Sequence, residues 1–297
     1  MARPRELRRR IRSVQNTRKI TKTMELVATS KLKRAQDRVV AARPYAAALA
    51  EVIADLYSPD LAERFALLRQ PGPPPVGAGG GRVALVVLTA NRGLCGAFNA
   101  NLIREGRRRL QELEGAGVAV DLHLVGKKGI GFFKFAGRAI ASQRTDIGDR
   151  PTAAHAAEVV TPLMRAFEGG TLDAVEVVFA RFQSAISSPP TVLRILPVTP
   201  PRADGRSGGR AVNYILAPSA DAILERLLPL YVENQMFRAL VETAAAFYGA
   251  QRTAMKNATD NAGEILEVLR RTYNRARQGQ ITQEIAEIVG GAEALQG

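Results

Sequence analysis

The chain is poor in the residues from which reactive sites are most often built. Its 297 residues include one Cys, two His and no Trp. A single Cys excludes a disulfide framework and a cysteine-based zinc cluster, and it is typical of a reducing compartment. The only histidines are His123 and His155, which are few ligands for a metal site built on imidazoles. We therefore expect no metal ion and no cofactor.

Long hydrophobic runs are also missing. No apolar stretch approaches the roughly 20 residues of a helix that crosses a bilayer. Residues 1–10 are rich in arginine and lead into no apolar segment, so we expect no secretory signal. Hydrophobic residues nevertheless make up 46% of the chain, which is too many for a disordered protein. The length allows one large domain or two ordinary ones.

Positive charge is the composition figure that stands out, and it is concentrated in one segment. The chain carries 42 Lys and Arg against 28 acidic residues, a net charge of +14. Residues 1–43 hold fourteen of the basic residues and three acids, so +11 of the excess lies there and only +3 elsewhere. Such a basic arm indicates a polyanionic partner: nucleic acid, an acidic membrane face or an acidic protein surface.

Apolar and small residues in this basic segment follow a helical repeat. They recur at alternating spacings of four and three for about seven heptads, which is typical of a coiled coil. The row consists of Leu7, Ile11, Val14, Arg18, Thr21, Glu25, Ala28, Leu32, Ala35, Val39, Ala42, Ala46, Leu49, Ile53 and Leu56. A second stripe, Ile20, Met24 and Val27, lies on another face and predicts that the helix changes partners along its length. Pro44 interrupts the row, so a kink or break is expected near Arg43.

The same spacing returns in the C-terminal third. A helix is predicted to start at Ser219 as its N-cap, with Pro229 as a point of separation. Its inward row is Phe237, Val241, Ala244, Tyr248, Gln251, Met255, Ala258, Ala262, Ile265, Leu269, Thr272 and Ala276. Residues 230–289 would span roughly 90 Å and the N-terminal helix roughly 75 Å, far more than the ~30 Å width of a small domain. The two helices are therefore predicted to pair antiparallel as a rod, and their Ala-rich seam buries so little area that further protein should surround it.

Between the helices, short apolar strands alternate with helical stretches. Strands are predicted at 83–88, 118–125 and 174–182, and helices at 97–114 and 153–167. This alternation indicates a small parallel sheet covered on both faces. The predicted fold class is α/β: a long antiparallel coiled coil of the N- and C-terminal helices with an inserted, small, Rossmann-like parallel-sheet domain. Four parts are expected: a coiled-coil helix at 1–58, a Pro/Gly-rich linker at 59–81, the α/β domain at 82–210 and the second coiled-coil helix at 211–297.

Two glycine-containing loops are candidate ligand sites. Gly126–Gly131 follows a strand but lacks the spacing of a phosphate-binding loop, so a glycine-permitted turn is the favoured interpretation. Asn91–Gly96 also lies at the carboxyl end of a strand, where open α/β sheets bind ligands, yet its glycines would serve a turn equally well. Cys95 has no nearby His and is predicted to be a small buried residue. No group of residues resembles an active site.

Longer motifs carry a resemblance that covers essentially the whole chain in order. They are IRSVQNTRKITKTMELVA at 11–28, SKLKRAQD at 30–37, AMKNATDNA at 254–262 and YNRARQGQITQE at 273–284, with RGLCG at 92–96 and PTV at 190–192 in between. Together they resemble the gamma subunit of F-type ATP synthases. The resemblance implies a non-catalytic central-stalk rotor that couples ion flow through a membrane ring to ATP synthesis or hydrolysis in a catalytic head.

The resemblance also implies partners and contact residues. One copy per complex would meet the alpha and beta subunits of the head, the epsilon subunit and the membrane c-ring, as a peripheral protein on the cytoplasmic face of a bacterial inner membrane, with no nucleic acid involved. Contacts with the catalytic subunits would come from Lys19, Lys22, Met24, Arg277, Gln278 and Thr282, and an apolar bearing from Ile285, Ile288 and Val289. The +11 arm would then face an acidic protein surface, where charge sets register and specificity. The coupling ion and the net direction of operation stay open.

Three positions depart from the family pattern, and two alternative functions compete with it. Gln251 replaces an arginine often found there, Asn91 stands where Asp is usual, and Ala217 replaces a common Glu. One alternative is a nucleic-acid-binding protein with a basic coiled-coil arm, although that arm has no aromatic residue before Tyr45. The other is an enzyme that uses a nucleotide in its α/β domain.

Overall fold

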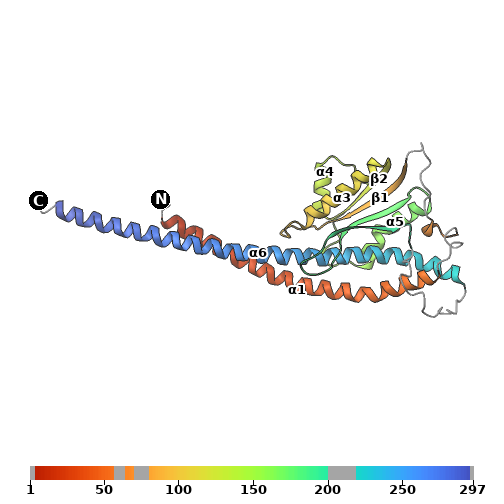
Figure 1. Cartoon of the computed structure of the whole chain (residues 1–297), viewed down its shortest axis with the longest axis horizontal. Coiled ribbons are helices and arrows are strands. Elements are labelled where there is room, and N and C mark those ends of the chain that lie inside the picture. Colours follow the sequence, from red (N-terminus) through yellow and green to blue (C-terminus); the bar gives the residue numbers. More distant parts are fainter. Residues whose placement is uncertain (1–3, 57–63, 70–79, 200–218, 295–297) are drawn as a thin grey trace. The chain divides into compact units, whose positions relative to one another are not determined.

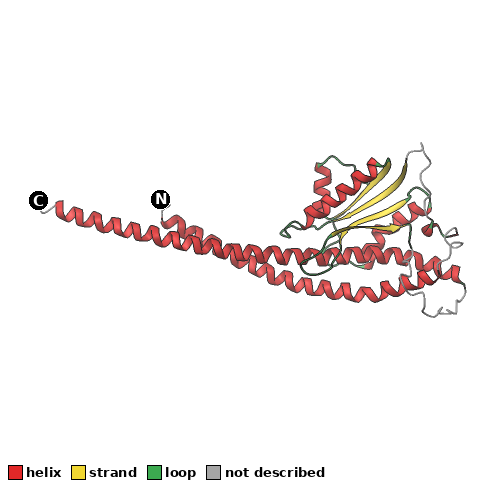
Figure 2. Cartoon of the chain, in the orientation of Figure 1, coloured by secondary structure: helices red, strands yellow, loops and turns green. Residues whose placement is uncertain are grey.

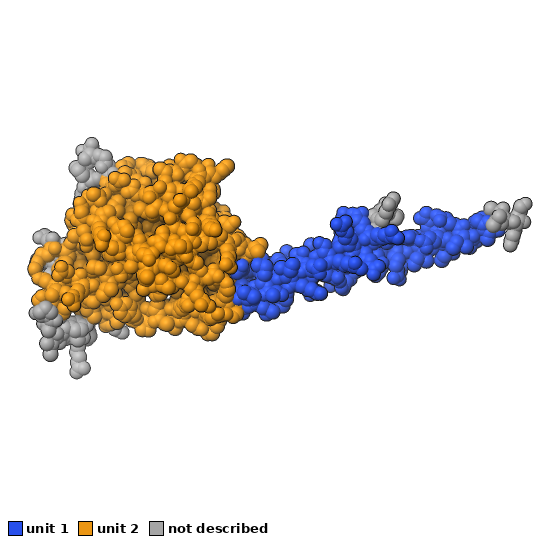
Figure 3. Space-filling model, turned by 180° about the vertical axis from the view of Figure 1, so that it is seen from behind, with its two compact units in different colours: residues 1–29, 251–297 blue, residues 30–250 orange. Residues whose placement is uncertain are grey.

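The computed structural model describes residues 4–56, 64–69, 80–199 and 219–294, which belong to two compact units. Residues 1–29 and 251–297 form one, called here the two-helix unit, and residues 30–250 form the other, called the α/β unit (Figure 3). Helices α1 (Pro4–Leu56) and α6 (Ala220–Ala294) contribute to both. The linker expected at 59–81 lies mostly outside the described residues, and the four-part division stays a prediction.

Helices α1 and α6 pair antiparallel, as predicted. In the two-helix unit, the hydroxyls of Thr21 and Thr259 are hydrogen-bonded at 2.8 Å and the Arg18 side chain lies against Gly263. In the α/β unit, the Lys31 ammonium lies 5.3 Å from the ring centre of Tyr248. The residue numbers of these contacts in α6 therefore decrease as those in α1 increase, which is the antiparallel arrangement. Figure 1 shows the two helices side by side within each unit.

The inward row of α1 is confirmed, whereas that of α6 shifts by one residue in its second half. Every predicted α1 position except Arg18 is buried or half-buried. In α6 the inward residues after Met255 are Thr259, Ala262, Leu266, Leu269, Tyr273 and Ala276. The predicted Ile265 is 52% exposed while Leu266 is 3% exposed. Two successive steps of four, from Gln251 to Met255 to Thr259, cause the shift, because a straight helix drifts away from a strict heptad and an extra step of four corrects the drift.

Of the kink or break expected near Arg43, no break occurs. Helix α1 is continuous through Pro44, and α6 is continuous through Pro229. Proline in a helix removes one backbone hydrogen bond, but Pro44 is exposed and Leu49 and Ile53 beyond it are buried. Packing of the following turns therefore outweighs the local cost. The predicted N-cap of α6 is confirmed, since the Ser219 hydroxyl accepts a hydrogen bond from the backbone N–H of Ala222 at 3.3 Å.

The α/β unit is built on a five-stranded sheet of order β3-β2-β1-β4-β5 (Figure 2). The strands are β1 (Gly80–Leu88), β2 (Val118–Val125), β3 (Ser142–Arg144), β4 (Ala174–Ala180) and β5 (Pro190–Leu196), and the remaining helices are η1 (Ala66–Leu68), α3 (Phe98–Gly115), α4 (Lys127–Phe135) and α5 (Ala153–Glu168). All pairings are parallel except that of β4 with β5. The predicted parallel sheet is therefore confirmed, with an antiparallel edge strand that the sequence reading missed, as it missed β3 and α4.

The two faces of the sheet are covered by different helices. Side chains of β1 and β4 that point to one face pack with α5 and with α1 and α6, whereas their neighbours in sequence belong to a second cluster with α3 and α4, which also takes in other residues of α1 and α6. The acid Glu242 of α6 is 2% exposed and accepts hydrogen bonds from the Phe182 backbone N–H at 3.1 Å and from Arg238 at 2.7 Å. This contact fastens α6 to the segment that follows β4.

The corrected inward row of α6 predicts unequal effects of two neighbouring truncations. Leu266→Ala removes a buried side chain from the seam and should lower the free energy of unfolding of the helical pair by about 2 kcal/mol. Ile265→Ala removes an exposed side chain and should change it by no more than about 0.5 kcal/mol. Thermal unfolding of the isolated chain followed by circular dichroism measures both. Equal effects, or the larger one at Ile265, would contradict the shifted row.

Candidate functional site

The C-terminal part of α6 has no partner among the described residues of the chain. Every residue from Arg277 to Ala292 is exposed, and Figure 1 shows α6 continuing past the first residues of α1. Arg277, Gln278 and Thr282 all lie on this segment. Thr282 donates its hydroxyl to the backbone carbonyl of Gln278 at 3.0 Å, and the other two side chains extend into solvent.

This exposed segment is amphipathic. Ile281, Ile285, Ile288 and Val289 recur at helical spacing and form one apolar stripe, with Ile288 72% exposed. The other side of the helix is polar, where Gln280 donates to Glu284 at 2.8 Å and Gln283 donates to Glu287 at 2.9 Å. The three predicted bearing residues therefore share a face, and Ile281, which the sequence reading omitted, belongs with them. Ile281 lies four residues before Ile285, and this helical spacing was enough to predict that it belongs to the stripe.

A second apolar stripe lies on α1. Ile20 is 61% exposed, Val27 is half-exposed and Met24 between them is half-buried. Ile20 and Val27 thus lie largely open to solvent, and the predicted change of partner along the helix stays a prediction. Contiguous apolar side chains on a surface mark interaction sites. The stripe of α1 therefore offers an apolar surface for which the described chain provides no cover.

Basic side chains accompany the α1 stripe. Lys19 and Lys22 are exposed and line a groove between α1 and α6 that also includes Arg18 and Asp260. Lys22 Nζ lies 3.2 Å from the Glu25 carboxylate, while Lys19 extends into solvent. The structure thus brings Lys19, Lys22 and the stripe to one stretch of helix, but the Arg277–Val289 residues lie on a different stretch of the same unit.

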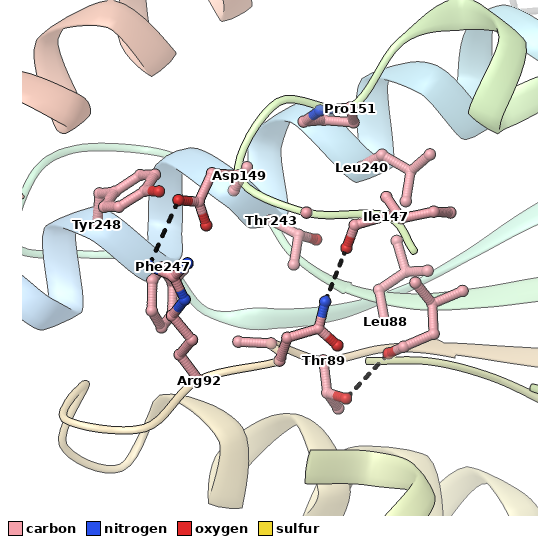
Figure 4. Close-up of a pocket in the computed structure, with 15 residues that line it drawn as sticks. Leu88, Thr89, Arg92, Ile147, Asp149, Pro151, Leu240, Thr243, Phe247 and Tyr248 are labelled. Carbon is pink, nitrogen blue, oxygen red and sulfur yellow. Dashed lines mark hydrogen bonds and ion pairs between the residues drawn. The ribbon is translucent and has the colours of Figure 1, made fainter. Parts of the chain in front are cut away.

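The loops at the carboxyl ends of β1 and β2 form a polar cluster in the α/β unit (Figure 4). The Asn91 amide donates to the backbone carbonyls of Thr145 at 2.9 Å and Ile147 at 3.1 Å, and its oxygen accepts the N–H of Lys127 at 2.9 Å. A carboxylate could not donate the first two hydrogen bonds. Asn instead of Asp at this position is therefore matched to the loop at 145–147.

A charged group continues this cluster toward the helices. Lys31 of α1 donates to the Asp149 carboxylate at 2.8 Å, and the guanidinium of Arg92 lies 3.8 Å from the same carboxylate. Burial alone would raise the pKa of Asp149, but hydrogen bonds from Lys31 and Tyr248, with the charges of Lys31 and Arg92, hold that pKa below its ordinary value. Burial raises the pKa of the Tyr248 phenol, and its hydrogen bond to Asp149 and the charge of that carboxylate raise it further.

The glycine loops serve packing. Gly126 adopts φ 98°, and a Cβ there would lie 2.1 Å from the Thr89 carbonyl oxygen. The N–H of Gly129 donates to the Thr89 hydroxyl at 2.9 Å, so this segment is the tight start of α4. Cys95 is buried as predicted, and burial raises the pKa of its thiol. In the part of the chain that the structure describes, no three His, Cys, Asp or Glu side chains are grouped so as to hold a metal ion, and no helix is long and apolar enough to cross a membrane.

Paired long helices with exposed apolar stripes, joined to a sheet domain, are typical of a protein that works through contacts with other subunits. Comparison with known proteins gives the family. The sequence model of a family described as ATP synthase matches residues 3–295. The ATP synthase gamma chain of Gemmatimonas aurantiaca is 65% identical over 297 residues, the whole of both chains. That of Moorella thermoacetica is 45% identical and covers 99% of this chain and 100% of its own.

Solved structures share the fold. Two matching chains come from cryo-EM structures of the Euglena gracilis mitochondrial ATP synthase, each 21% identical, with TM-scores of 0.68 and 0.64. They cover 98% and 94% of this chain, and 94% and 98% of their own. The chain belongs to the family of ATP synthase gamma chains, the non-catalytic central-stalk subunits of F-type ATP synthases. None of these three comparisons supports the nucleic-acid-binding alternative.

The charged cluster predicts a pH-dependent contribution to stability. Asp149→Asn keeps the shape of the side chain but removes its charge, and at pH 7 it should lower the free energy of unfolding by about 1 kcal/mol or less, because the pair with Lys31 is partly screened by solvent. The pKa of Asp149 is depressed by folding, so its contribution is present above the unfolded pKa and lost as the pH falls through the folded value. Urea unfolding at pH 7 and at about pH 3 should show wild type and variant converging in acid. A difference that persists or grows in acid would contradict the assignment.

Proposed function

We propose that this chain is the rotating shaft of its ATP synthase, turning with the membrane c-ring inside a head of alpha and beta subunits. Membership of the gamma family supports this proposal, as do the unpartnered apolar stripes on α1 and α6, which need surrounding protein. One copy per complex is proposed, because a single shaft occupies the centre of the head. The epsilon subunit is proposed to sit beside the α/β unit, and the complex to lie at the cytoplasmic face of a bacterial inner membrane.

The proposed bearing is the apolar stripe of α6. Ile285, Ile288 and Val289, with Ile281 added, would rest against a ring of apolar side chains supplied by the head. An apolar contact suits a surface that must slide, because hydrophobic attraction has no preferred direction. The observation that carries this assignment is the exposure of the whole stripe on a segment without a partner.

The proposed contacts with the catalytic subunits are polar. Lys19, Lys22 and the neighbouring Met24 would face an acidic loop of a catalytic subunit, and Arg277, Gln278 and Thr282 would contact loops of these subunits nearer the bearing. Exposed lysines and arginines next to an acidic surface guide orientation and raise the rate of association more than they add affinity. The basic character of residues 1–43 is thereby assigned to an acidic protein partner.

Assembly tests the proposed partners. Co-expression of this chain with the alpha and beta subunits of the same organism should yield an ATPase complex that contains one copy of the chain. Native mass spectrometry at low salt measures the composition. Because charged contacts are screened by salt, raising the salt concentration should slow assembly from separated subunits. A complex with two copies, or a chain that copurifies with nucleic acid and without the head subunits, would rule the proposal out.

The bearing is tested by substitutions matched between the two sides of α6. Changing Ile285, Ile288 and Val289 together to Ser should lower ATP-driven ion pumping several-fold relative to ATP hydrolysis, since the shaft loses its apolar contact with the head. The control changes Gln280, Gln283 and Glu287 to Ser on the polar side of the same helix and should leave that ratio close to wild type. Removing residues 277–297 should weaken coupling or assembly further. Equal coupling in both triple variants would exclude the assigned stripe as the bearing.

A further inference from the structure

Helix α4 of the α/β unit buries one side and leaves the other in solvent. Gly129, Ile130 and Phe133 are buried. The exposed residues fall together on the opposite side by helical spacing, and they are called here the α4 face: Lys127, Lys128, Gly131, Lys134 and Phe135. In Figure 1, α4 lies on the outer side of the sheet domain, away from the segments of α1 and α6 that belong to the same unit. None of the contacts assigned above uses this face.

Two apolar side chains stand in solvent at the α4 face. Phe135 is 92% exposed, more than any other large hydrophobic residue that the structure describes. Leu94 is 61% exposed and has φ 61°, a left-handed conformation that leucine rarely adopts. A Cβ at Gly93 would lie 3.8 Å from Cε of Lys128, so the loop that carries Leu94 borders this face. Exposed apolar side chains that lie beside one charged surface indicate a contact with something outside the chain.

The charge of the α4 face has a single sign. No acidic residue occurs in the sequence between Leu122 and Thr145. Among the described residues, Arg138 forms an ion pair with Glu114 at 2.8 Å, whereas the lysines at 127, 128 and 134 form none. Three uncompensated positive charges therefore lie on one side of a nine-residue helix. Such a surface attracts a negatively charged partner.

The residue types favour a lipid surface over nucleic acid or an acidic protein. Lysine is a hydrated point charge on a flexible stem, whereas arginine is the residue suited to bidentate recognition of single phosphates and carboxylates. Lysines beside an exposed aromatic ring are typical of surfaces that lie in the interface of an anionic membrane. The phenyl ring of Phe135 has no polar atom to pair with a protein or a base. A membrane is also at hand, because the ATP synthase is a membrane-associated complex.

We propose that the α4 face docks on the surface of a bilayer that contains anionic lipids. The three lysine ammonium groups would lie among the lipid head groups, and the Phe135 ring would enter the boundary with the acyl chains. The bound lipids would be neighbours without fixed positions, since a bilayer is fluid, so the contact is compatible with a subunit that turns. This contact adds a direct lipid surface to the subunit contacts proposed above and does not depend on them.

A fluorescent residue placed at 135 tests the docking in the full-length chain. Residues 1–43 are also strongly basic, so sedimentation with vesicles does not identify which surface binds, whereas a probe at one residue does. The chain has no Trp, so Phe135→Trp supplies a single reporter. With vesicles of phosphatidylcholine and phosphatidylglycerol its emission should shift to shorter wavelength, and brominated lipids should quench it. Ile186→Trp, at a position of the same unit that is 91% exposed, should show neither effect.

Removing the lysines tests the electrostatic part. In the Phe135→Trp chain, Lys127→Gln, Lys128→Gln and Lys134→Gln together should raise the lipid concentration needed for half of the shift. A rise of roughly fivefold per lysine is expected, on the order of a hundredfold in total. Added salt should have the same direction of effect. Thermal unfolding should be unchanged because these side chains are exposed.

A matched control removes the same charge elsewhere in the unit. Arg150, Arg165 and Arg181 are exposed and form no ion pair among the described residues. Changing them together to Gln should leave the lipid dependence of the reporter close to that of its parent. An equal loss in both triple variants would overturn the proposal, because it would show a general effect of net charge.

Three further results would also overturn the proposal. One is a shift at residue 135 as large with vesicles of phosphatidylcholine alone. Another is a shift as large with polyglutamate or single-stranded DNA, which would assign the α4 face to an acidic protein or to nucleic acid. The third is equal quenching by brominated lipids at residues 135 and 186. These readouts use the chain by itself, so their failure would leave the proposed rotor function untouched.

Discussion

The antiparallel contact between α1 and α6 is the constraint on which the rest of the structure depends. It pairs the N-terminal helix with the C-terminal helix, so that everything between residues 57 and 219 becomes an insertion between the two. Its seam combines small side chains, among them Ala28, Ala35 and Ala262, with larger ones such as Leu32 and Leu266, and the small side chains bury little apolar area. The hydrogen bond between Thr21 and Thr259 gives the seam a polar pair that fixes which residues face each other. A thin, specific seam leaves the outer faces of both helices available for other subunits.

Buried charge holds the inserted domain to the helices. Glu242 of α6 accepts a hydrogen bond from the backbone N–H of Phe182, and Lys31 of α1 donates one to Asp149 in the loop before α5. Removing Arg238, the partner of the buried Glu242, would cost more than that pair itself contributes, because the buried carboxylate would be left without compensation. These contacts therefore specify where the sheet domain attaches, while the apolar packing of β1 and β4 against the helices supplies most of the stabilisation.

Much of the fold could be predicted from the sequence, because hydrophobic periodicity reports burial directly. The α1 row and the strand at 118–125 follow from spacing alone. The predictions failed where a local pattern was ambiguous or overridden. Helix α4 contains Gly129 and Gly131, which weaken a helical pattern, and β5 begins at Pro190 within a Pro-rich stretch. The shift from Ile265 to Leu266 rests on one extra step of four, which an apolar pattern with an isoleucine and a leucine side by side cannot reveal. The exposed residues of the candidate site are found through family motifs, whereas Lys31, Asp149 and Tyr248 meet only through tertiary contacts between distant segments.

The end of the paired region has a mechanical consequence. Up to about Ala276, α6 is supported by α1, and from Arg277 onward it continues as a single helix. The resistance of a rod to twisting rises steeply with its radius, so a lone helix winds further than a pair under the same torque. When a torque acts about the axis of the two-helix unit, most of the twist will therefore occur in the segment that carries Arg277, Gln278 and the apolar stripe. The single-helix segment is therefore more compliant in torsion than the paired region of the same unit.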